Sequence, residues 1–200
     1  MPGTSAPGAV PTSTVHARTG LVPGDAVRAA AAASVVVAVG LDGVATALFL
    51  LVLGGTMVPR ALGLTAPLDV AYSATLLASA WAAQLEWYRA VPWLDLPVHA
   101  ACTGLVAAVA YVALVRTGLL ADAGTLRPGR ARAGVLVVTA GLGSVLAILW
   151  ELGEWAGHTY LDDRIGVGYG DTVTDLAAGL LGAVVAGLLV PGSLRRGATP

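Results

Sequence analysis

Five long apolar segments, separated by short stretches of turn residues, dominate the pattern of this chain. They cover residues 29–53, 66–86, 97–116, 133–156 and 173–190. Each reaches about the 20 residues that an α-helix needs to cross the ~30 Å hydrocarbon core of a bilayer. The pattern therefore predicts an all-α protein, built as a polytopic transmembrane bundle of about five helices.

The breaks between these segments carry glycine and proline, which interrupt helices. They fall at residues 54–59, 92–97, 128–129 and 166–170. Residues 1–26 are rich in Pro, Gly, Ser and Thr without periodicity, which predicts a disordered tail. We therefore expect a single transmembrane helical domain over residues 27–192, followed by a short tail over residues 193–200.

Composition favours a membrane protein and argues against a nucleic-acid-binding one. Hydrophobic residues make up 56% of the chain and charged residues only 12%, whereas soluble domains carry about 25% charged residues. The formal net charge is −1, and a nucleic-acid-binding surface needs a basic excess. The single cysteine, Cys102, excludes an internal disulfide. The lipid bilayer is the partner that this composition predicts.

Five crossings would divide the loops between two sides of the membrane. The N-terminus, residues 87–96 and residues 157–172 would share the first side with four arginines, Arg18, Arg28, Arg89 and Arg164. The other side would carry the remaining seven, Arg60, Arg116, Arg127, Arg130, Arg132, Arg195 and Arg196. Because cytoplasmic loops are enriched in Lys and Arg, this distribution predicts a multi-pass cell-membrane protein with a cytoplasmic C-terminus.

Acidic and histidine side chains gather at the predicted outer ends of three segments. Within each segment they are spaced three or four residues apart, so they share one helical face. Imidazole and carboxylate groups are common ligands of divalent metal ions. We therefore predict seven candidate metal ligands: Asp95, His99, Glu151, Glu154, His158, Asp171 and Asp175. Glu86, at the end of the second segment, is expected at the same level.

Glu151 is the most informative member of this group. It lies about two helical turns, roughly 10 Å, inside the end that His158 marks, and it follows an uninterrupted apolar run. A lone carboxylate at the centre of a membrane helix costs about 2.5–3.5 kcal/mol or more. Glu151 should therefore have a partner, a proton or a metal ion, and we interpret Glu151 and Glu154 as candidate catalytic residues.

Simpler roles are open for several polar residues. Asp95, just ahead of Pro97, and Asp171, ahead of the last segment, are each plausible helix N-caps. Asp42, near the middle of the first apolar segment, is either a proton or ion carrier or a hydrogen-bond partner of a neighbouring helix. The run of Asp162, Asp163 and Arg164 is typical of a solvated loop.

Three short motifs resemble bacterial membrane protein families. Residues 92–99 read Pro-Trp-Leu-Asp-Leu-Pro-Val-His, residues 150–154 read Trp-Glu-x2-Glu, and residues 170–182 read Gly-Asp-Thr-x2-Asp-Leu-x2-Gly-x2-Gly. In this order they resemble the YjdF-type inner-membrane family over residues 66–190, and they are more distantly similar to VanZ-like proteins. The resemblance implies a polytopic bacterial membrane protein with a polar cluster. Because Glu154 stands where VanZ-like proteins carry Gln, it implies no glycopeptide-resistance function.

Three hypotheses for the function follow from the polar cluster. The first is a metal-dependent enzyme acting on a lipid or envelope substrate, in which Zn, Mn, Fe or Mg activates water or polarises a phosphate or acyl group. The second is a proton- or ion-coupled transporter in which Glu151, Glu154 and Asp42 titrate. The third is a non-enzymatic membrane component in which the cluster braces the loops or binds a partner.

Overall fold

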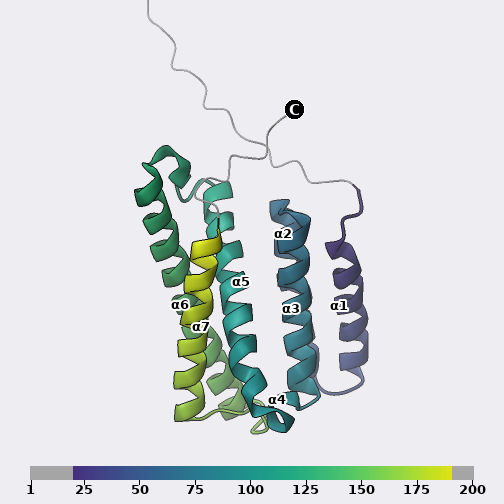
Figure 1. Ribbon diagram of the computed structural model, residues 1–200. Helices are drawn as coiled ribbons and strands as arrows, with labels where there is room; N and C mark the ends of the chain where they lie inside the picture. Colours follow the sequence, from purple (N-terminus) through teal and green to yellow (C-terminus); the bar gives the residue numbers. More distant parts are fainter. Residues whose placement is uncertain (1–19, 191–200) are drawn as a thin grey trace, which may run out of the picture.

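The chain folds as an up-and-down bundle of helices (Figure 1). The computed structural model describes residues 20–190, so most of the predicted N-terminal tail and all of residues 193–200 lie outside the described range. Within that range there are six long helices: α1 (Gly24–Val39), α2 (Gly43–Leu62), α3 (Ala66–Gln84), α5 (Asp95–Arg116), α6 (Pro128–Tyr160) and α7 (Tyr169–Leu189). A short helix α4 (Trp87–Ala90) and two 3₁₀ turns, η1 (Pro92–Leu94) and η2 (Ala123–Thr125), lie in the connections. The predicted all-α bundle is confirmed.

Four segments of the described chain are long and apolar enough to cross a membrane. They are α2, α5 together with η1 (Pro92–Arg116), α6 and α7. The side chains are distributed as lipid requires: Leu51, Val137 and Leu181 are more than half exposed, whereas Ala31 and Ala183 are fully buried. Small residues at helix contacts and large apolar residues on the outside are typical of bundles whose solvent is the bilayer.

The prediction of one helix over residues 29–53 is wrong, because a helical hairpin occupies this stretch. α1 ends at Val39 and α2 begins at Gly43. Asp42 causes the break: its backbone is extended, and its Oδ1 accepts a hydrogen bond from the backbone N–H of Ala45 at 2.7 Å. This is the N-cap interaction, which satisfies a free amide at a helix start. Asp42 therefore lies in a turn and not near the middle of a membrane helix.

The predicted break at residues 54–59 is also wrong, because α2 continues through it. Pro59 lies inside α2, and the helix ends only at Leu62. Gly63 follows with φ of 62°, the left-handed conformation that commonly terminates helices. The turn between α2 and α3 is therefore short, and the helix predicted over residues 66–86 is found as α3.

The hairpin changes the topology of the bundle. The turn at residues 40–42, α4 and the α6–α7 loop at residues 161–168 share one end, which we call the α4 end (lower in Figure 1). The start of α1 lies at the opposite end, and Arg28 lies there too. The prediction that Arg28 lies on the same side as Arg89 and Arg164 is therefore wrong. Of the arginines in residues 20–190, the opposite end holds Arg28, Arg60, Arg116, Arg127, Arg130 and Arg132.

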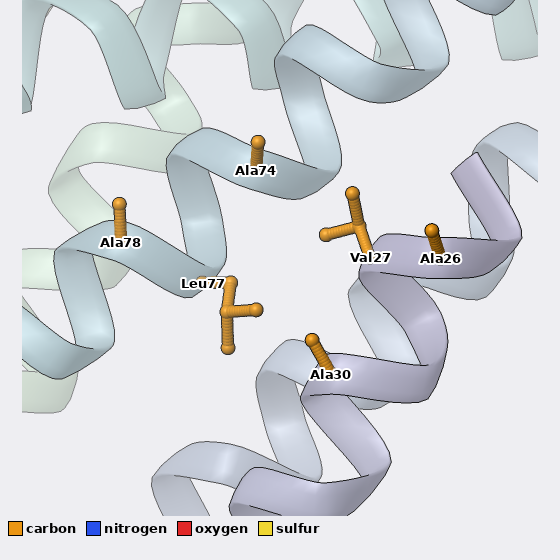
Figure 2. A pocket seen from close by; sticks show the side chains of 6 residues that line it. All are labelled: Ala26, Val27, Ala30, Ala74, Leu77 and Ala78. Carbon is orange, nitrogen blue, oxygen red and sulfur yellow. The ribbon is translucent and has the colours of Figure 1, made fainter. Parts of the chain in front are cut away.

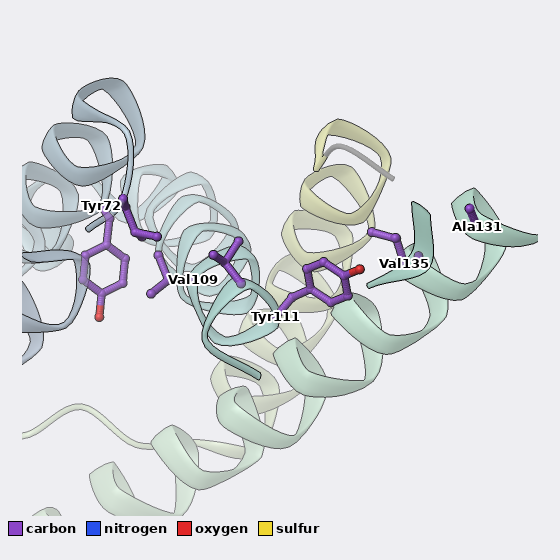
Figure 3. Close-up of a cluster of buried hydrophobic side chains, with 8 residues drawn as sticks. Tyr72, Val109, Tyr111, Ala131 and Val135 are labelled. Atoms are coloured by element: carbon purple, nitrogen blue, oxygen red, sulfur yellow. The ribbon is translucent and has the colours of Figure 1, made fainter. Parts of the chain in front are cut away.

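The bundle has two halves, joined chiefly between α3 and α5. The first half contains α1, α2 and α3, and the second contains α5, α6 and α7. Figure 3 shows apolar side chains that continue across the junction, from Tyr72 of α3 through Val109 and Tyr111 of α5 to Val135 of α6. This core lies towards the end opposite α4 and packs α5 of the second half against α3 of the first.

A buried ion-pair network ties the first half together at the end opposite α4. Arg28, only 6% exposed, lies 2.6 Å from Asp69 of α3 and 3.0 Å from Asp25 of its own helix. Its Nε also donates to the backbone oxygen of Thr56 in α2 at 2.8 Å. Arg28 thus contacts all three helices of this half, a long-range relationship that the sequence pattern did not reveal.

An apolar groove runs along the outside of the first half, between α1 and α3. Figure 2 shows the side chains that line it. They come from α1 and α3, and they are Ala26, Val27, Ala30, Ala74, Leu77 and Ala78. The absence of a charged or hydrogen-bonding side chain among these lining residues fits a lipid-facing surface.

Candidate metal centre

Three side chains of the ligand type come together at the α4 end of the second half. One ligand atom from each of Asp95, His99 and Asp175 lies within 4.8 Å of the other two. The Nε2 of His99 lies 3.5 Å from Oδ1 of Asp95 and 3.9 Å from Oδ2 of Asp175. Two ligands bound about 2.1 Å from one ion are about 3.0–3.4 Å apart. Small side-chain movements would therefore bring all three atoms onto one cation.

Two helices that run in the same direction build this group (Figure 1). Asp95 is the first residue of α5, and His99 follows one turn later on the same face. Asp175 lies in the second turn of α7. The two helices touch through backbone, because a Cβ at Gly104 would lie 2.7 Å from the carbonyl oxygen of Gly182. This close approach brings Asp175 next to His99.

Asp175 is the most buried member of the group. The residue is 2% exposed, and its Oδ1 is buried without a hydrogen-bond partner within residues 20–190. Removing a carboxylate from water costs several kcal/mol, roughly, even after relaxation of the surrounding protein. An ionised Asp175 therefore needs a positive partner, and the histidine 3.9 Å away from Oδ2 leaves Oδ1 unsatisfied.

Three more of the predicted ligands surround this group. Glu151 and Glu154 are half-buried on α6, and Asp171 is exposed in the first turn of α7. Glu151 interacts through charge with His99 and Asp171. Glu154 interacts through charge with Glu151 and Asp175. The structure thus brings six of the seven predicted ligands into one electrostatic cluster, in which three are close enough together to share one ion.

The N-cap alternative does not describe Asp95 or Asp171. The N-cap position of α5 is held by Leu94, and that of α7 by Gly168. Neither cap residue forms a side-chain hydrogen bond at its helix start. Asp95 and Asp171 lie within the first turns of the two helices. The positive end of the helix dipole stabilises a negatively charged side chain there.

His158 and Glu86 do not join the group. The Nδ1 of His158 lies 2.7 Å from the backbone oxygen of Ile165, so it holds the α6–α7 loop against the end of α6. Glu86 has a φ of 57° and an exposed side chain, with Oε2 3.6 Å from the guanidinium of Arg89. His158 was suggested by its helical spacing and Glu86 by its place at the end of the second segment, and neither signal shows which way the following loops turn.

Arg164, interpreted from the sequence as part of a solvated loop, makes contacts that the sequence did not predict. Its Nη2 lies 2.6 Å from Oδ2 of Asp162 and 3.3 Å from Oδ2 of Asp42. The hydrogen bonds that Asp162 accepts from the guanidinium and the backbone N–H of Arg164 hold the pKa of Asp162 below its usual range. Arg89 donates in turn to the backbone oxygen of Arg164 at 3.0 Å. The loop is solvated, as predicted, yet it is fastened to two other segments.

Comparison with known proteins gives one match. The model of a family described as "Predicted membrane protein (DUF2238)" matches residues 25–196, which is most of the chain. Comparisons with curated proteins and with solved structures give no match. The family match confirms the coarse part of the resemblance, a family of membrane proteins, whereas the more distant similarity to VanZ-like proteins stays a prediction.

Proposed function

We propose a metal-binding function for this chain, which belongs to the DUF2238 family of predicted membrane proteins. One divalent metal ion would be held by Asp95, His99 and Asp175 at the α4 end. The observation that carries the proposal is the carboxyl group of Asp175, which belongs to the group of three ligand side chains and has one oxygen, Oδ1, buried without a hydrogen-bond partner in the described residues. A cation at this point would give that oxygen a partner.

The charge balance of the cluster supports the same conclusion. Among the groups whose charges act on Asp95, Glu151, Glu154 and Asp175, His99 is the one able to carry positive charge within residues 20–190. A single imidazolium cannot balance four carboxylates. Like charges repel strongly in a medium of low dielectric constant, so the four carboxyl groups cannot all be ionised without further positive charge, which either protons or a divalent ion would supply.

The ligand set favours a transition metal ion. One imidazole nitrogen with two carboxylates suits Zn, Mn or Fe, whereas Mg and Ca prefer oxygen ligands alone. Three protein ligands also leave coordination positions open, as in catalytic rather than structural zinc sites. An open position admits water or a substrate oxygen.

Metal-dependent hydrolysis is the reaction class that we propose for this site. The metal ion would supply a water molecule of lowered pKa at neutral pH. Glu151 and Glu154, half-buried next to the three ligands, would accept and return the proton of that water. Trp93 is 70% exposed and Trp87 50% exposed at the same end, and tryptophan is enriched where membrane meets water. A lipid or another envelope substrate at the membrane surface fits these surroundings.

The orientation that we propose places the α4 end outside the cell. Within residues 20–190, six arginines lie at the opposite end, and only Arg89 and Arg164 lie at the α4 end. By the positive-inside rule the arginine-rich end is cytoplasmic. Both the start of α1 and the end of α7 are at that end, so the proposal keeps the C-terminus in the cytoplasm.

Metal titration of the purified protein tests this function. The full chain in detergent, freed of metal by a chelator, is titrated with Mn²⁺ and followed by electron paramagnetic resonance. We expect one ion per chain, with binding lost in His99→Ala and Asp175→Asn. Glu86→Gln is the matched control, because it removes an exposed carboxylate at the same end. Absence of stoichiometric binding by the unchanged protein, or unchanged binding by His99→Ala, would overturn the proposal.

A second experiment separates a metal-dependent enzyme from a metal-binding component without activity. The metal-loaded protein is incubated with vesicles of polar envelope lipids, and the products are followed by mass spectrometry. We expect hydrolysis of a lipid that Glu154→Gln abolishes while Mn²⁺ binding persists. Metal binding without any lipid product, in unchanged protein and variant alike, would reject the enzymatic part of the proposal.

A further inference from the structure

We infer that Arg164 is a positioning residue for the metal centre, because it fastens together the segments that lead into the two ligand-bearing helices. This inference rests on the proposed metal-binding function. Within residues 20–190, the hydrogen bonds and ion pairs of Arg164 are with Asp42, Asp162 and Arg89, and with none of the three proposed ligands. Its role would be to fix where α5 and α7 begin with respect to each other.

Three segments from distant parts of the chain meet at this arginine. The guanidinium joins Asp162 of its own loop, at 2.6 Å, to Asp42 of the α1–α2 turn, at 3.3 Å. The backbone oxygen accepts a hydrogen bond from Arg89 of α4 at 3.0 Å. Arg164 thus connects the first half of the bundle, the interfacial helix α4 and the α6–α7 loop on one surface.

Two of these segments lead directly into the ligands. α4 is followed by the turn η1 and then by α5, which begins at Asp95. The α6–α7 loop is followed by α7, which carries Asp175. The next residue of the loop, Ile165, is held from the other side by its backbone oxygen, 2.7 Å from Nδ1 of His158. The loop is therefore fixed to α6 on one side and to α4 and the α1–α2 turn on the other.

The exposure of the ion pair between Arg164 and Asp42 argues that this pair contributes little to overall stability. The side chain of Arg164 is 68% exposed and that of Asp42 37% exposed. Ion pairs in such positions contribute little to the free energy of unfolding and are screened by salt. Ligand geometry is more sensitive to small displacements than overall stability is, because a metal site must hold its ligands within about 0.5 Å of the binding geometry.

Asp42 offers a selective variant for the test. Asn is as good an N-cap as Asp, so Asp42→Asn keeps the hydrogen bond to Ala45 and removes the charge that faces Arg164. Asp163→Asn is the matched control, since it removes an exposed carboxylate next to Arg164 in the same loop. Arg164→Ala removes the guanidinium and both of its ion pairs.

The experiment measures Mn²⁺ affinity and the thermal unfolding midpoint of the metal-free full chain in detergent, at low and at high salt. We expect Arg164→Ala to weaken binding by about two- to fivefold, the most that exposed ion pairs can supply, Asp42→Asn to weaken it by a smaller factor, and Asp163→Asn to bind like the unchanged protein. The metal-free midpoints should be equal, and the difference in affinity should shrink at high salt.

Three results would overturn the inference, and each has a distinct meaning. Equal affinity of Arg164→Ala and the unchanged protein would show that the loop contacts do not position the centre. Weaker binding together with a lowered metal-free midpoint would assign Arg164 a structural role. Absence of Mn²⁺ binding by the unchanged protein would overturn the proposed function itself, and this inference with it.

Discussion

His99 of α5 and Asp175 of α7 face each other across two parallel helices, with Nε2 and Oδ2 3.9 Å apart. The histidine reaches Asp95 of its own helix at 3.5 Å, so it lies between two carboxylates. The other oxygen of Asp175 is buried without a hydrogen-bond partner in residues 20–190. This relationship places the buried carboxyl group of Asp175 beside two side chains that could share a cation with it.

The first prediction concerns the metal-free protein. Asp175→Asn removes a buried negative charge without changing the size of the side chain, so it should stabilise the metal-free chain by roughly 1–2 kcal/mol. The same change should abolish the stabilisation that Mn²⁺ gives the unchanged protein through mass action. Thermal unfolding in detergent, with and without Mn²⁺, measures both effects. A variant that is less stable than the unchanged protein without metal would contradict the prediction.

The second prediction concerns the contact between α5 and α7. A Cβ at Gly182 would overlap the carbonyl oxygen of Ala100, the residue that follows His99. Gly182→Ala must therefore push the two helices apart, and we expect it to destabilise the protein by about 1–3 kcal/mol. It should also weaken Mn²⁺ binding, because Asp175 lies on the displaced helix.

Gly141→Ala is the control for this change. Gly141 lies in α6, and a Cβ there would have no neighbour within 4 Å. Replacing glycine by alanine in an open helical position should stabilise by about 0.5–1 kcal/mol. If Gly182→Ala behaves like Gly141→Ala in unfolding and in Mn²⁺ titration, the close contact between the helices does not position the site.

The helices and the grouping of Asp95, His99 and Asp175 were predictable from the sequence for a physical reason. Long apolar runs must be helical in a bilayer, and the spacing of Asp95 and His99 fixes their common face. The helices α3, α5, α6 and α7 therefore fall close to the predicted segments. The prediction also brought Asp175 to the same end of the molecule, because it lies near the start of a segment that begins at that end.

The parts that were missed depend on contacts between residues distant in sequence or on single turns. Asp42 ends one helix and caps the next within an otherwise continuous apolar run, so hydropathy alone merges α1 and α2. Arg28 and Asp69 pair across helices, and periodicity does not show pairing. His158 has the right spacing for the cluster, but it is not part of the group of three ligand atoms, and its Nδ1 lies 2.7 Å from the backbone oxygen of Ile165. The local pattern of apolar and polar residues in the sequence shows none of these relationships.

The third prediction concerns the ion-pair network of the first half. Asp69→Asn would leave the buried Arg28 without its 2.6 Å partner. Breaking one side of a buried ion pair typically costs about 3–5 kcal/mol. Because Asp25 still lies 3.0 Å from Arg28 in the variant, thermal unfolding in detergent should show a loss near the lower end of that range. Mn²⁺ affinity should remain unchanged in the variant that is still folded, because Asp69 and the candidate metal centre lie at opposite ends of the bundle. A mild effect, within the range of Glu86→Gln, would show that solvent reaches Arg28.

The fourth prediction distinguishes the hairpin from a single first helix. With Cys102→Ser as background, single cysteines are introduced as Leu41→Cys, Asp163→Cys and Gly129→Cys, and intact cells are treated with a membrane-impermeant maleimide. In the structure Leu41 is 51% exposed in the α1–α2 turn, at the same end as Asp163, whereas Gly129 begins α6 at the other end. We expect the first two variants to react from outside the cell and the third to react only after the membrane is opened.

One continuous helix over residues 29–53 would instead hold residue 41 in the hydrocarbon core, where a thiol is shielded from a polar reagent. A Leu41→Cys variant that fails to react even in opened membranes, while Asp163→Cys reacts, would therefore contradict the hairpin, and reaction of Gly129→Cys in intact cells would reverse the proposed orientation.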